Sequence, residues 1–350
     1  MPDSSLSLAE LVRGHEEWRR HCLNLIASEN RLCARARPYL TSDLEGRYGD
    51  YRDNDLGARQ YRGNRWVEAI ERRVQEIARQ AFGAEHVELR PLSGHMSGLA
   101  GIMAVARPGD TLLEVGPDGG GHLLATSLAA SALVDLDVRY LPFDGARYNV
   151  DGPAAAEMIR ELRPKMVILG CSNFLFPHPV RELSDAVHAI PGACLAYDAS
   201  HVLGLLAAGR FQRPLEEGAD VVWGSTHKTL PEPQGGIVYS NDEALMGAVG
   251  DAIYPTMTSN YHLARIPALG AALEEMTAGG AAYVDHVLAN AQALGEALAA
   301  EGLTVVRVDG RYSRSHTLLV ASGAFATGDE AASALDEANI MTTATQLPAC

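Results

Sequence analysis

The chain of 350 residues lacks several features that would assign it to a particular class of protein. Its five cysteines are odd in number and show no CxxC spacing, which argues against a disulfide framework or a zinc knuckle and indicates a reducing compartment. No stretch approaches the ~18 unbroken apolar residues of a membrane span, and no charged-then-apolar signal pattern opens the chain. We therefore expect a cytoplasmic protein without a membrane partner.

The chain also has fewer basic than acidic residues. Lysine and arginine number 29 against 44 aspartates and glutamates, which gives a formal net charge of -15. Phosphates would be repelled along most faces, so we expect no nucleic-acid partner. Basic residues are denser between Arg13 and Arg37, but glutamates interrupt them, which favours an arm that faces solvent or another subunit.

Short apolar runs alternate with helical patterns along most of the chain. Candidate strands lie at 87–90, 111–115, 138–141, 166–169, 193–197, 221–223 and 236–239. This alternation is typical of an α/β fold, in which helices cover both faces of a mostly parallel sheet. From about residue 261 the pattern changes to long helices rich in alanine and leucine, at 262–276 and 283–301, and strands are expected after them at 304–308 and 317–320. We expect an N-terminal arm over 1–40, a large domain over 41–270 and a smaller α+β domain over 271–350.

Two reactive side chains follow apolar strands in this pattern. Lys228 comes after the run 220–223, and Asp198 ends the run 194–197. Open α/β folds bind ligands beyond the carboxyl ends of their strands. A lysine amine can condense with the aldehyde of pyridoxal 5'-phosphate, and an aspartate can keep the pyridine nitrogen protonated, so that the ring acts as an electron sink. The pair predicts a pyridoxal-phosphate site; the alternatives are a surface lysine and a helix-capping aspartate.

Other polar segments could complete such a site. Ser93-Gly94-His95 forms a small-residue turn before an apolar helix, whose N-terminal amides and dipole suit a phosphate. Three glycines precede His122, so the backbone there could approach a planar ligand and stack the imidazole on it. His201 lies three residues after Asp198 and could orient it, and Ser172 follows another strand as a possible donor.

Two other kinds of site are excluded by missing partners. A metal centre built from Asp198, His201 and His227 would lack a thiolate or a second carboxylate, so we expect no metal. A dinucleotide site would need GxGxxG after the first strand, and the sequence does not contain it there.

These segments occur together, in this order, in one family. From about residue 23 to its end the chain resembles serine hydroxymethyltransferase, a fold type I pyridoxal-phosphate enzyme of the aspartate-aminotransferase class. The most specific segments are Leu-Ile-Ala-Ser-Glu-Asn at 25–30 and Thr-His-Lys-Thr-Leu at 226–230. The resemblance implies hydroxymethyl or aldol transfer at the α-carbon of glycine, serine or a related β-hydroxy amino acid, through a Schiff base on Lys228 and a quinonoid intermediate.

The resemblance also implies roles for individual residues. Lys228 would bind the cofactor, His122 would stack on its ring, and Glu45 would reach the substrate hydroxyl from the other subunit of a homodimer. Ser28 and Tyr61 would join Glu45 on the substrate side. The further cofactor-binding residues would be Ser93, Gly94, His95, Ser172, Asp198, His201, Ser225 and His227.

Departures from the family pattern bear on the choice of substrate. Tandem tyrosines of the folate and substrate region are represented by Gln60-Tyr61-Arg62-Gly63, after an insertion of polar residues at 48–56. The family's Gly-Pro-Arg-Gly-Gly after the lysine becomes Glu-Pro-Gln-Gly-Gly at 232–236, and a glycine-rich loop is replaced at 256–260. These changes leave tetrahydrofolate open as a second cofactor and keep a folate-independent threonine aldolase or transaldolase as the alternative.

The family's arginine for the substrate carboxylate normally lies beyond Cys350, where this sequence ends. A bidentate arginine is the natural partner of a carboxylate. We expect that the sequence is a fragment; the alternative is that Arg59, Arg62 or Arg65 does this work. The missing arginine is also the sole support for a third hypothesis, a non-catalytic paralogue that keeps the fold for assembly or regulation.

Overall fold

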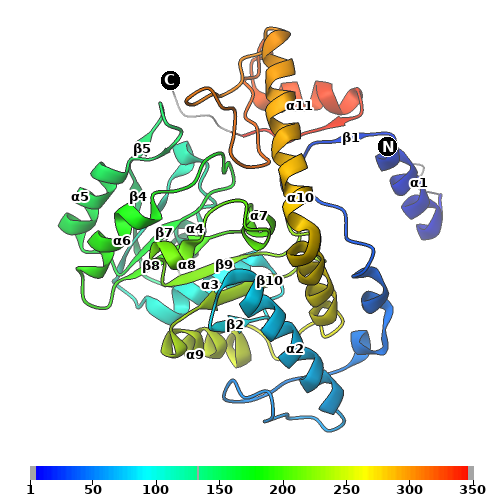
Figure 1. The fold of residues 1–350 in the computed structure, drawn as a ribbon, viewed down its shortest axis with the longest axis vertical. Coiled ribbons are helices and arrows are strands. Elements are labelled where there is room, and N and C mark those ends of the chain that lie inside the picture. Colours follow the sequence, from blue (N-terminus) through cyan, green and yellow to red (C-terminus); the bar gives the residue numbers. More distant parts are fainter. Residues whose placement is uncertain (1–4, 132–133, 346–350) are drawn as a thin grey trace.

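A seven-stranded sheet forms the centre of the structure, which is a computed structural model describing residues 5–131 and 134–345 (Figure 1). The strands inside the two edges are buried along most of their length, because helices lie over both faces. In spatial order they are β2 (His86–Glu88), β10 (Gly236–Ser240), β9 (Val221–Ser225), β8 (Cys194–Asp198), β7 (Met166–Leu169), β3 (Thr111–Val115) and β4 (Asp137–Leu141).

Most neighbouring strands of this sheet run parallel. From β9 to β4 every adjacent pair is parallel, whereas β10 runs antiparallel to both β9 and β2. The register places Asp198, the last residue of β8, opposite Trp223 of β9. The α/β fold with a mostly parallel sheet, predicted from the alternation of apolar runs and helical patterns, is confirmed.

Successive residues of the central strands pack into two different cores. In β8, Leu195 and Tyr197 belong to one cluster, while Cys194 and Ala196 belong to the other, as the alternation of side chains along a strand requires. The first core is covered by α2 (Arg65–Phe82), α5 (Gly152–Leu162), α6 (Val180–His188), α7 (Leu203–Ala207), α8 (Pro214–Glu217) and α10 (Arg265–Ala300). The second is covered by α3 (Gly94–Val105), α4 (Leu124–Ala130) and α9 (Glu243–Asp251).

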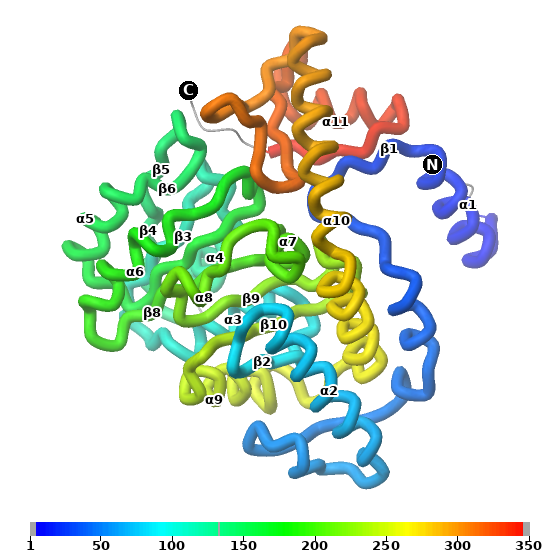
Figure 2. Tube along the Cα trace, viewed as in Figure 1, coloured from blue at the N-terminus to red at the C-terminus, as the bar shows by residue number. Residues whose placement is uncertain are grey.

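The N-terminal segment lies outside this layered body (Figure 2). It begins with α1 (Leu8–Arg20), which buries none of its residues, and continues through β1 (Leu23–Asn24) and two short 3-10 helices, Arg37–Thr41 and Asp43–Gly46. Strand β1 pairs in parallel with β11 (Ile340–Met341), which follows α11 (Gly328–Glu337). Cys33 and Ala36 then pack against Ala268 and Ala272 of α10. The segment therefore joins the C-terminal part of the chain to the long helix.

The remaining short elements connect the larger ones. Strands β5 (Phe143–Asp144) and β6 (Asn149–Val150) form a small antiparallel pair. A 3-10 helix spans Pro117–Gly119, and a π-helical segment spans Ala252–Met257.

The region after residue 261 differs from the sequence-based expectation. One continuous helix, α10, replaces the two helices expected at 262–276 and 283–301, because Gly279 and Gly280 remain helical. A glycine costs a helix only about 1 kcal/mol relative to alanine, and the buried residues on either side of the pair keep α10 packed. The strands expected at 304–308 and 317–320 are reduced to isolated bridges such as Val305 with Val320. The expected boundary near 270 falls inside α10, and the three-part division stays a prediction.

Two further observations concern membrane spans and cysteines. No helix of the part of the chain that the structure describes is long and apolar enough to cross a membrane. Cys22, Cys33, Cys171 and Cys194 are free thiols, and Cys350 lies outside the described residues.

A buried group of charged side chains anchors the segment around Arg59, which follows the inserted residues 48–56, to α2 and to Tyr261 before α10. The Arg59 guanidinium pairs with the Glu71 carboxylate, and the side chains are 6% and 3% exposed. Arg59 also donates to the Gly49 carbonyl and, at 3.2 Å, to the Tyr261 hydroxyl, which itself donates to Glu71. Because Arg59 is committed to this group, it is no candidate for a substrate carboxylate within its own chain.

Removing the carboxylate of this group should destabilise the protein strongly. Glu71→Ala leaves the Arg59 guanidinium buried without a counter-charge, so the free energy of unfolding in urea should fall by about 3–5 kcal/mol. Glu76→Ala is the matched control on the same helix, because Glu76 pairs with Arg73 in solvent, and its loss should stay below about 1 kcal/mol. Equal losses for the two variants would contradict the anchoring role of Arg59 and Glu71.

Candidate active site

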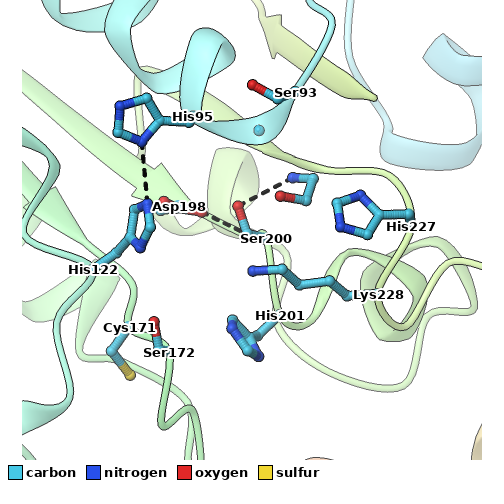
Figure 3. A pocket seen from close by; sticks show the side chains of 12 residues that line it. Ser93, His95, His122, Cys171, Ser172, Asp198, Ser200, His201, His227 and Lys228 are labelled. Atoms are coloured by element: carbon cyan, nitrogen blue, oxygen red, sulfur yellow. Dashed lines mark hydrogen bonds between the residues drawn. The ribbon is translucent and has the colours of Figure 1, made fainter. Parts of the chain in front are cut away.

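A cavity of about 220 Å³ lies at the carboxyl-terminal edge of the parallel strands (Figure 3). Five chain segments that are far apart in sequence meet there. Its lining residues are Ser93, Gly94, His95, His122, Cys171, Ser172, Asp198, Ser200, His201, Ser225, His227 and Lys228. The structure thus brings together all ten residues that the sequence nominates for binding the cofactor, and it adds Cys171 and Ser200.

Strand topology explains why these residues meet. Strands β3, β7, β8 and β9 run parallel, so the segments that follow their last residues emerge at one edge of the sheet. Gly119–His122 follows β3, Cys171-Ser172 follows β7, and Asp198 ends β8. Ser225 ends β9 and leads to Lys228, while α3 begins beside it at Gly94.

Lys228 extends its side chain into the cavity between Ser200 and His201 (Figure 3). Burial lowers the pKa of the Lys228 amine below its ordinary value, and the nearby Asp198 carboxylate opposes this shift. A lowered pKa increases the fraction of neutral amine, which is the nucleophilic form. The other lysine of the chain, Lys165, instead donates to the Gly192 carbonyl at 2.5 Å.

Asp198 has one carboxylate oxygen fixed and one left for a ligand. Its Oδ1 accepts a hydrogen bond from the Ser200 amide at 2.9 Å, and no group of the described chain bonds its Oδ2. Ser200 also accepts from the Ser225 amide through its hydroxyl at 3.1 Å, which joins the ends of β8 and β9. Sequence reasoning missed Ser200, although its place two residues after Asp198 was a signal for such a turn.

The N-terminus of α3 approaches the end of β9 as closely as a backbone allows. A Cβ atom on Gly94 would lie 2.1 Å from the Ser225 hydroxyl oxygen and 2.6 Å from its amide nitrogen, so this contact requires glycine. Ser93 caps the helix by accepting from the Met96 amide at 3.1 Å. The unpaired amides of the first turn and the helix dipole make this corner of the cavity suitable for a phosphate.

The glycine-rich turn before His122 is equally constrained. A Cβ atom on Gly121 would lie 1.7 Å from the Val115 carbonyl oxygen, and one on Gly120, whose φ is +70°, would collide with Asn173. The turn presents an exposed His122 ring, whose Nε2 lies 3.4 Å from Nδ1 of His95. An exposed imidazole at the mouth of a cavity can stack on a planar ligand.

Two further histidines lie deeper in the cavity and stay neutral. Burial lowers the pKa of His201 well below its ordinary value, and the positive charge of Lys228 lowers it further. The same two causes lower the pKa of His227. The Nδ1 atoms of both rings are buried and find no hydrogen-bond partner among the described residues. Buried polar atoms are normally satisfied, so these two indicate a polar ligand.

The residues present fit pyridoxal 5'-phosphate. The Lys228 amine can react with the cofactor's aldehyde, and the free carboxylate oxygen of Asp198 can pair with the cofactor's pyridine nitrogen. The N-terminus of α3 can bind the cofactor's phosphate. By contrast, no group of three His, Cys, Asp or Glu side chains in the described ranges is placed to hold a metal ion.

Three residues expected on the substrate side do not line this cavity. Tyr61 lines a separate surface pocket with Gly46, Arg47, Tyr48, Arg62 and Asn64. Its ring meets that of Tyr48 edge-on at 5.2 Å, and both rings are exposed. Glu45 precedes Gly46 in the second 3-10 helix, beside the same pocket, and Ser28 lies in the N-terminal segment. Within one chain these three side chains therefore lie outside the lining of the cavity that holds Lys228.

A buried arginine from α10 supports the loop that follows Lys228. The Arg265 guanidinium lies against Gly235, contacts the carbonyls of Pro91 and Gly236 at 3.4 Å each, and pairs with Glu232 at 3.4 Å. Burial raises the pKa of Glu232 to about 7, although Arg265 opposes the shift. Arg265 thus connects the loop after Lys228 to the end of β2 that leads into Ser93. Sequence spacing did not reveal this role of Arg265.

Comparison with known proteins gives consistent matches. Over residues 1–349 the chain matches the family model described as serine hydroxymethyltransferase. Serine hydroxymethyltransferase from Methanopyrus kandleri is 40% identical over 342 residues, which cover 98% of this chain and 79% of that protein. The one from Aeropyrum pernix is 40% identical over 344 residues, covering 98% and 77%. Among solved structures, L-threonine transaldolase from Pseudomonas fluorescens matches with a TM-score of 0.90 at 26% identity, covering 97% of this chain and 78% of that one.

Proposed function

The chain belongs to the serine hydroxymethyltransferase family, and we propose that the cavity around Lys228 is where it carries out the chemistry of that family. It is a pyridoxal-phosphate enzyme of fold type I, which transfers a hydroxymethyl or related aldol group at the α-carbon of glycine, serine or a similar β-hydroxy amino acid. The observation that carries the placement of the site is one cavity that holds both Lys228 and Asp198, each half-buried.

Lys228 and Asp198 hold opposite ends of the cofactor in this proposal. When bound, pyridoxal 5'-phosphate supplies an electron sink for the pair left at the α-carbon. The Lys228 amine, whose pKa burial lowers, binds the aldehyde. The free Oδ2 of Asp198 accepts a hydrogen bond from the protonated pyridine nitrogen and keeps it charged.

The other lining residues orient the cofactor between these two ends. The α3 amides after Ser93, at Gly94 and His95, hold the phosphate, and Ser225 packs against that turn. His122 stacks on the ring, as its exposed position at the mouth of the cavity permits. The remaining polar contacts with the cofactor come from Ser172, His201 and His227.

Glu45, Tyr61 and Ser28 form the substrate side of the proposed site. Glu45 acts as the acid and base that takes and returns the proton of the substrate hydroxyl. Glu45 and Tyr61 lie outside the cavity of their own chain, which is consistent with their serving the cavity of a second copy. The proposal therefore includes a homodimer with shared active sites; a cytoplasmic location stays a prediction.

A folate-independent transaldolase is the second candidate function. The solved L-threonine transaldolase shares the fold with a TM-score of 0.90. The changed segments Gln60–Gly63 and Thr256–Asn260 belong to regions where the family resemblance places folate, substrate and the partner's phosphate contacts. Both candidates use the same Lys228 site, so they differ in the molecule that accepts the aldehyde.

The aldehyde acceptor can be determined by absorbance. Glycine added to the cofactor-loaded protein should give a long-wavelength band, and tetrahydrofolate should strengthen it several-fold if hydroxymethyl transfer is the main activity. If tetrahydrofolate leaves the intensity of the band unchanged and acetaldehyde quenches it, the activity is instead that of a transaldolase. Lys228→Ala should show neither band nor bound chromophore, whereas Lys165→Ala should behave as the wild type, because Lys165 lies outside the cavity.

Shared sites can be tested by mixing two inactive variants. Glu45→Gln should lower kcat by about 10²–10⁴-fold, as the loss of a general acid and base does. Co-assembly with Lys228→Ala should restore activity to about a quarter of the wild type, since half of the dimers then contain one intact site.

The matched control for this mixing combines Lys228→Ala with Asp198→Ala. Both residues line the same cavity, so every site in that mixed dimer lacks one of them and no activity should return. Failure of the Glu45 mixture to recover would contradict the assignment of Glu45 to the partner's site.

A further inference from the structure

His316 connects the wall of the cavity to the N-terminal segment. Its Nε2 lies 2.9 Å from the Ala27 carbonyl oxygen. Its ring lies nearly parallel to that of His201, with an interplanar angle of 17° and centroids 6.1 Å apart. His201 lines the cavity beside Lys228, and Ala27 immediately precedes Ser28. The His316 imidazole therefore contacts both His201, on the cofactor side, and the segment that carries Ser28, on the substrate side.

The hydrogen bond to Ala27 defines the chemical state of His316. A carbonyl oxygen can only accept, so Nε2 must carry the proton. Burial lowers the pKa of His316 to about 4, and the positive charge of Lys228 acts in the same direction, while the bond to Ala27 opposes them. The ring is therefore neutral near physiological pH, and it acts through its donor and its flat face.

His316 is held rigidly by its own loop. The Ser315 hydroxyl donates to the Phe174 carbonyl, and it accepts from the Thr317 amide at 3.1 Å. The Arg314 amide donates to the Leu175 carbonyl at 2.9 Å. Ser315 and Thr317, on either side of His316, are buried. Because its neighbours on both sides are held, the His316 side chain can restrict the movement of the residues that it contacts.

The segment around Ser28 has fixed points on either side of the His316 contact. Leu25 donates to the Met341 carbonyl at 2.8 Å, beside the pairing of β1 with β11. Cys33 donates to the Pro231 carbonyl at 3.0 Å, in the loop after Lys228. The bond from His316 to Ala27 lies between these two points, next to Ser28.

We propose that His316 is a positioning residue that fixes His201 on the cofactor side and Ala27-Ser28 on the substrate side of one active site. The inference rests on the proposed function, because it names the two sides by the roles given there. The ring face holds His201, whose carbonyl accepts from the Thr229 hydroxyl at 2.9 Å, and the Nε2–H group holds the Ala27 carbonyl.

Two substitutions separate these contacts. His316→Phe keeps a flat ring for His201 but loses the donor to Ala27, whereas His316→Gln keeps a donor but loses the ring. The Phe variant should raise KM for the amino acid about three- to ten-fold with kcat nearly unchanged, because one hydrogen bond near Ser28 is lost. The Gln variant should keep KM near the wild-type value and shift the pH titration of the cofactor absorbance. His286→Gln, at an exposed position on α10, is the control.

Hydrogen exchange can be measured on the cofactor-free protein, so it tests the role of His316 independently of the proposed function. Hydrogen exchange of the amides in 25–30 should accelerate about three- to ten-fold in His316→Phe, and return toward the wild-type rate in His316→Gln. If His316→Phe does not fold, His316→Asn replaces it, because the shorter amide falls short of Ala27.

Unchanged exchange in 25–30, or equal KM values for the Phe and Gln variants, would overturn the inference while leaving the Lys228 site in place. A wild-type protein that binds no cofactor would instead remove the proposed function, and the exchange experiment would still decide whether His316 holds Ala27.

Discussion

The burial of the Lys228 amine near the Asp198 carboxylate is the interaction on which the rest of the site depends. Burial favours the neutral amine, and Asp198 limits how far this goes, so the lysine stays reactive within a polar cavity. Parallel pairing of β8 and β9 is what places the two side chains at one edge of the sheet. The chemistry thus follows from strand order, because the same residues on an antiparallel pair would emerge at opposite edges.

Close backbone contacts and buried charges stabilise the sheet edge that carries Lys228 and Asp198. Gly94 lets the first turn of α3 rest on the end of β9, and Gly121 lets the turn before His122 rest on Val115. Arg265 and Glu232 tie the loop after the lysine to the strand end before Ser93. These contacts join segments far apart in sequence, so the shape of the cavity depends on how the strands and helices that carry them pack together.

Local spacing in the sequence was sufficient to predict the mostly parallel sheet and most of the residues that line the cavity, whereas Ser225 and His227 were nominated by the family resemblance and Cys171 and Ser200 were missed. Each of those residues follows a strand, and parallel strands deliver such positions to one edge. Spacing could not reveal Arg265 or His316, because Arg265 comes from α10 and His316 from a loop, and neither follows a strand of the sheet. It also divided α10 at two glycines that packing keeps helical. Glu45 and Tyr61 were nominated by resemblance, and their separation from Lys228 within one chain is visible only in the structure.

Borohydride reduction of the cofactor-loaded protein, followed by peptide mapping, identifies the lysine that binds the cofactor. The chain contains Lys165 and Lys228, which makes Lys165 an internal control in the same sample. We expect that reduction leaves the cofactor covalently attached to the peptide that carries Lys228 and leaves the Lys165 peptide unmodified. Attachment at Lys165, or no attachment at all, would contradict it.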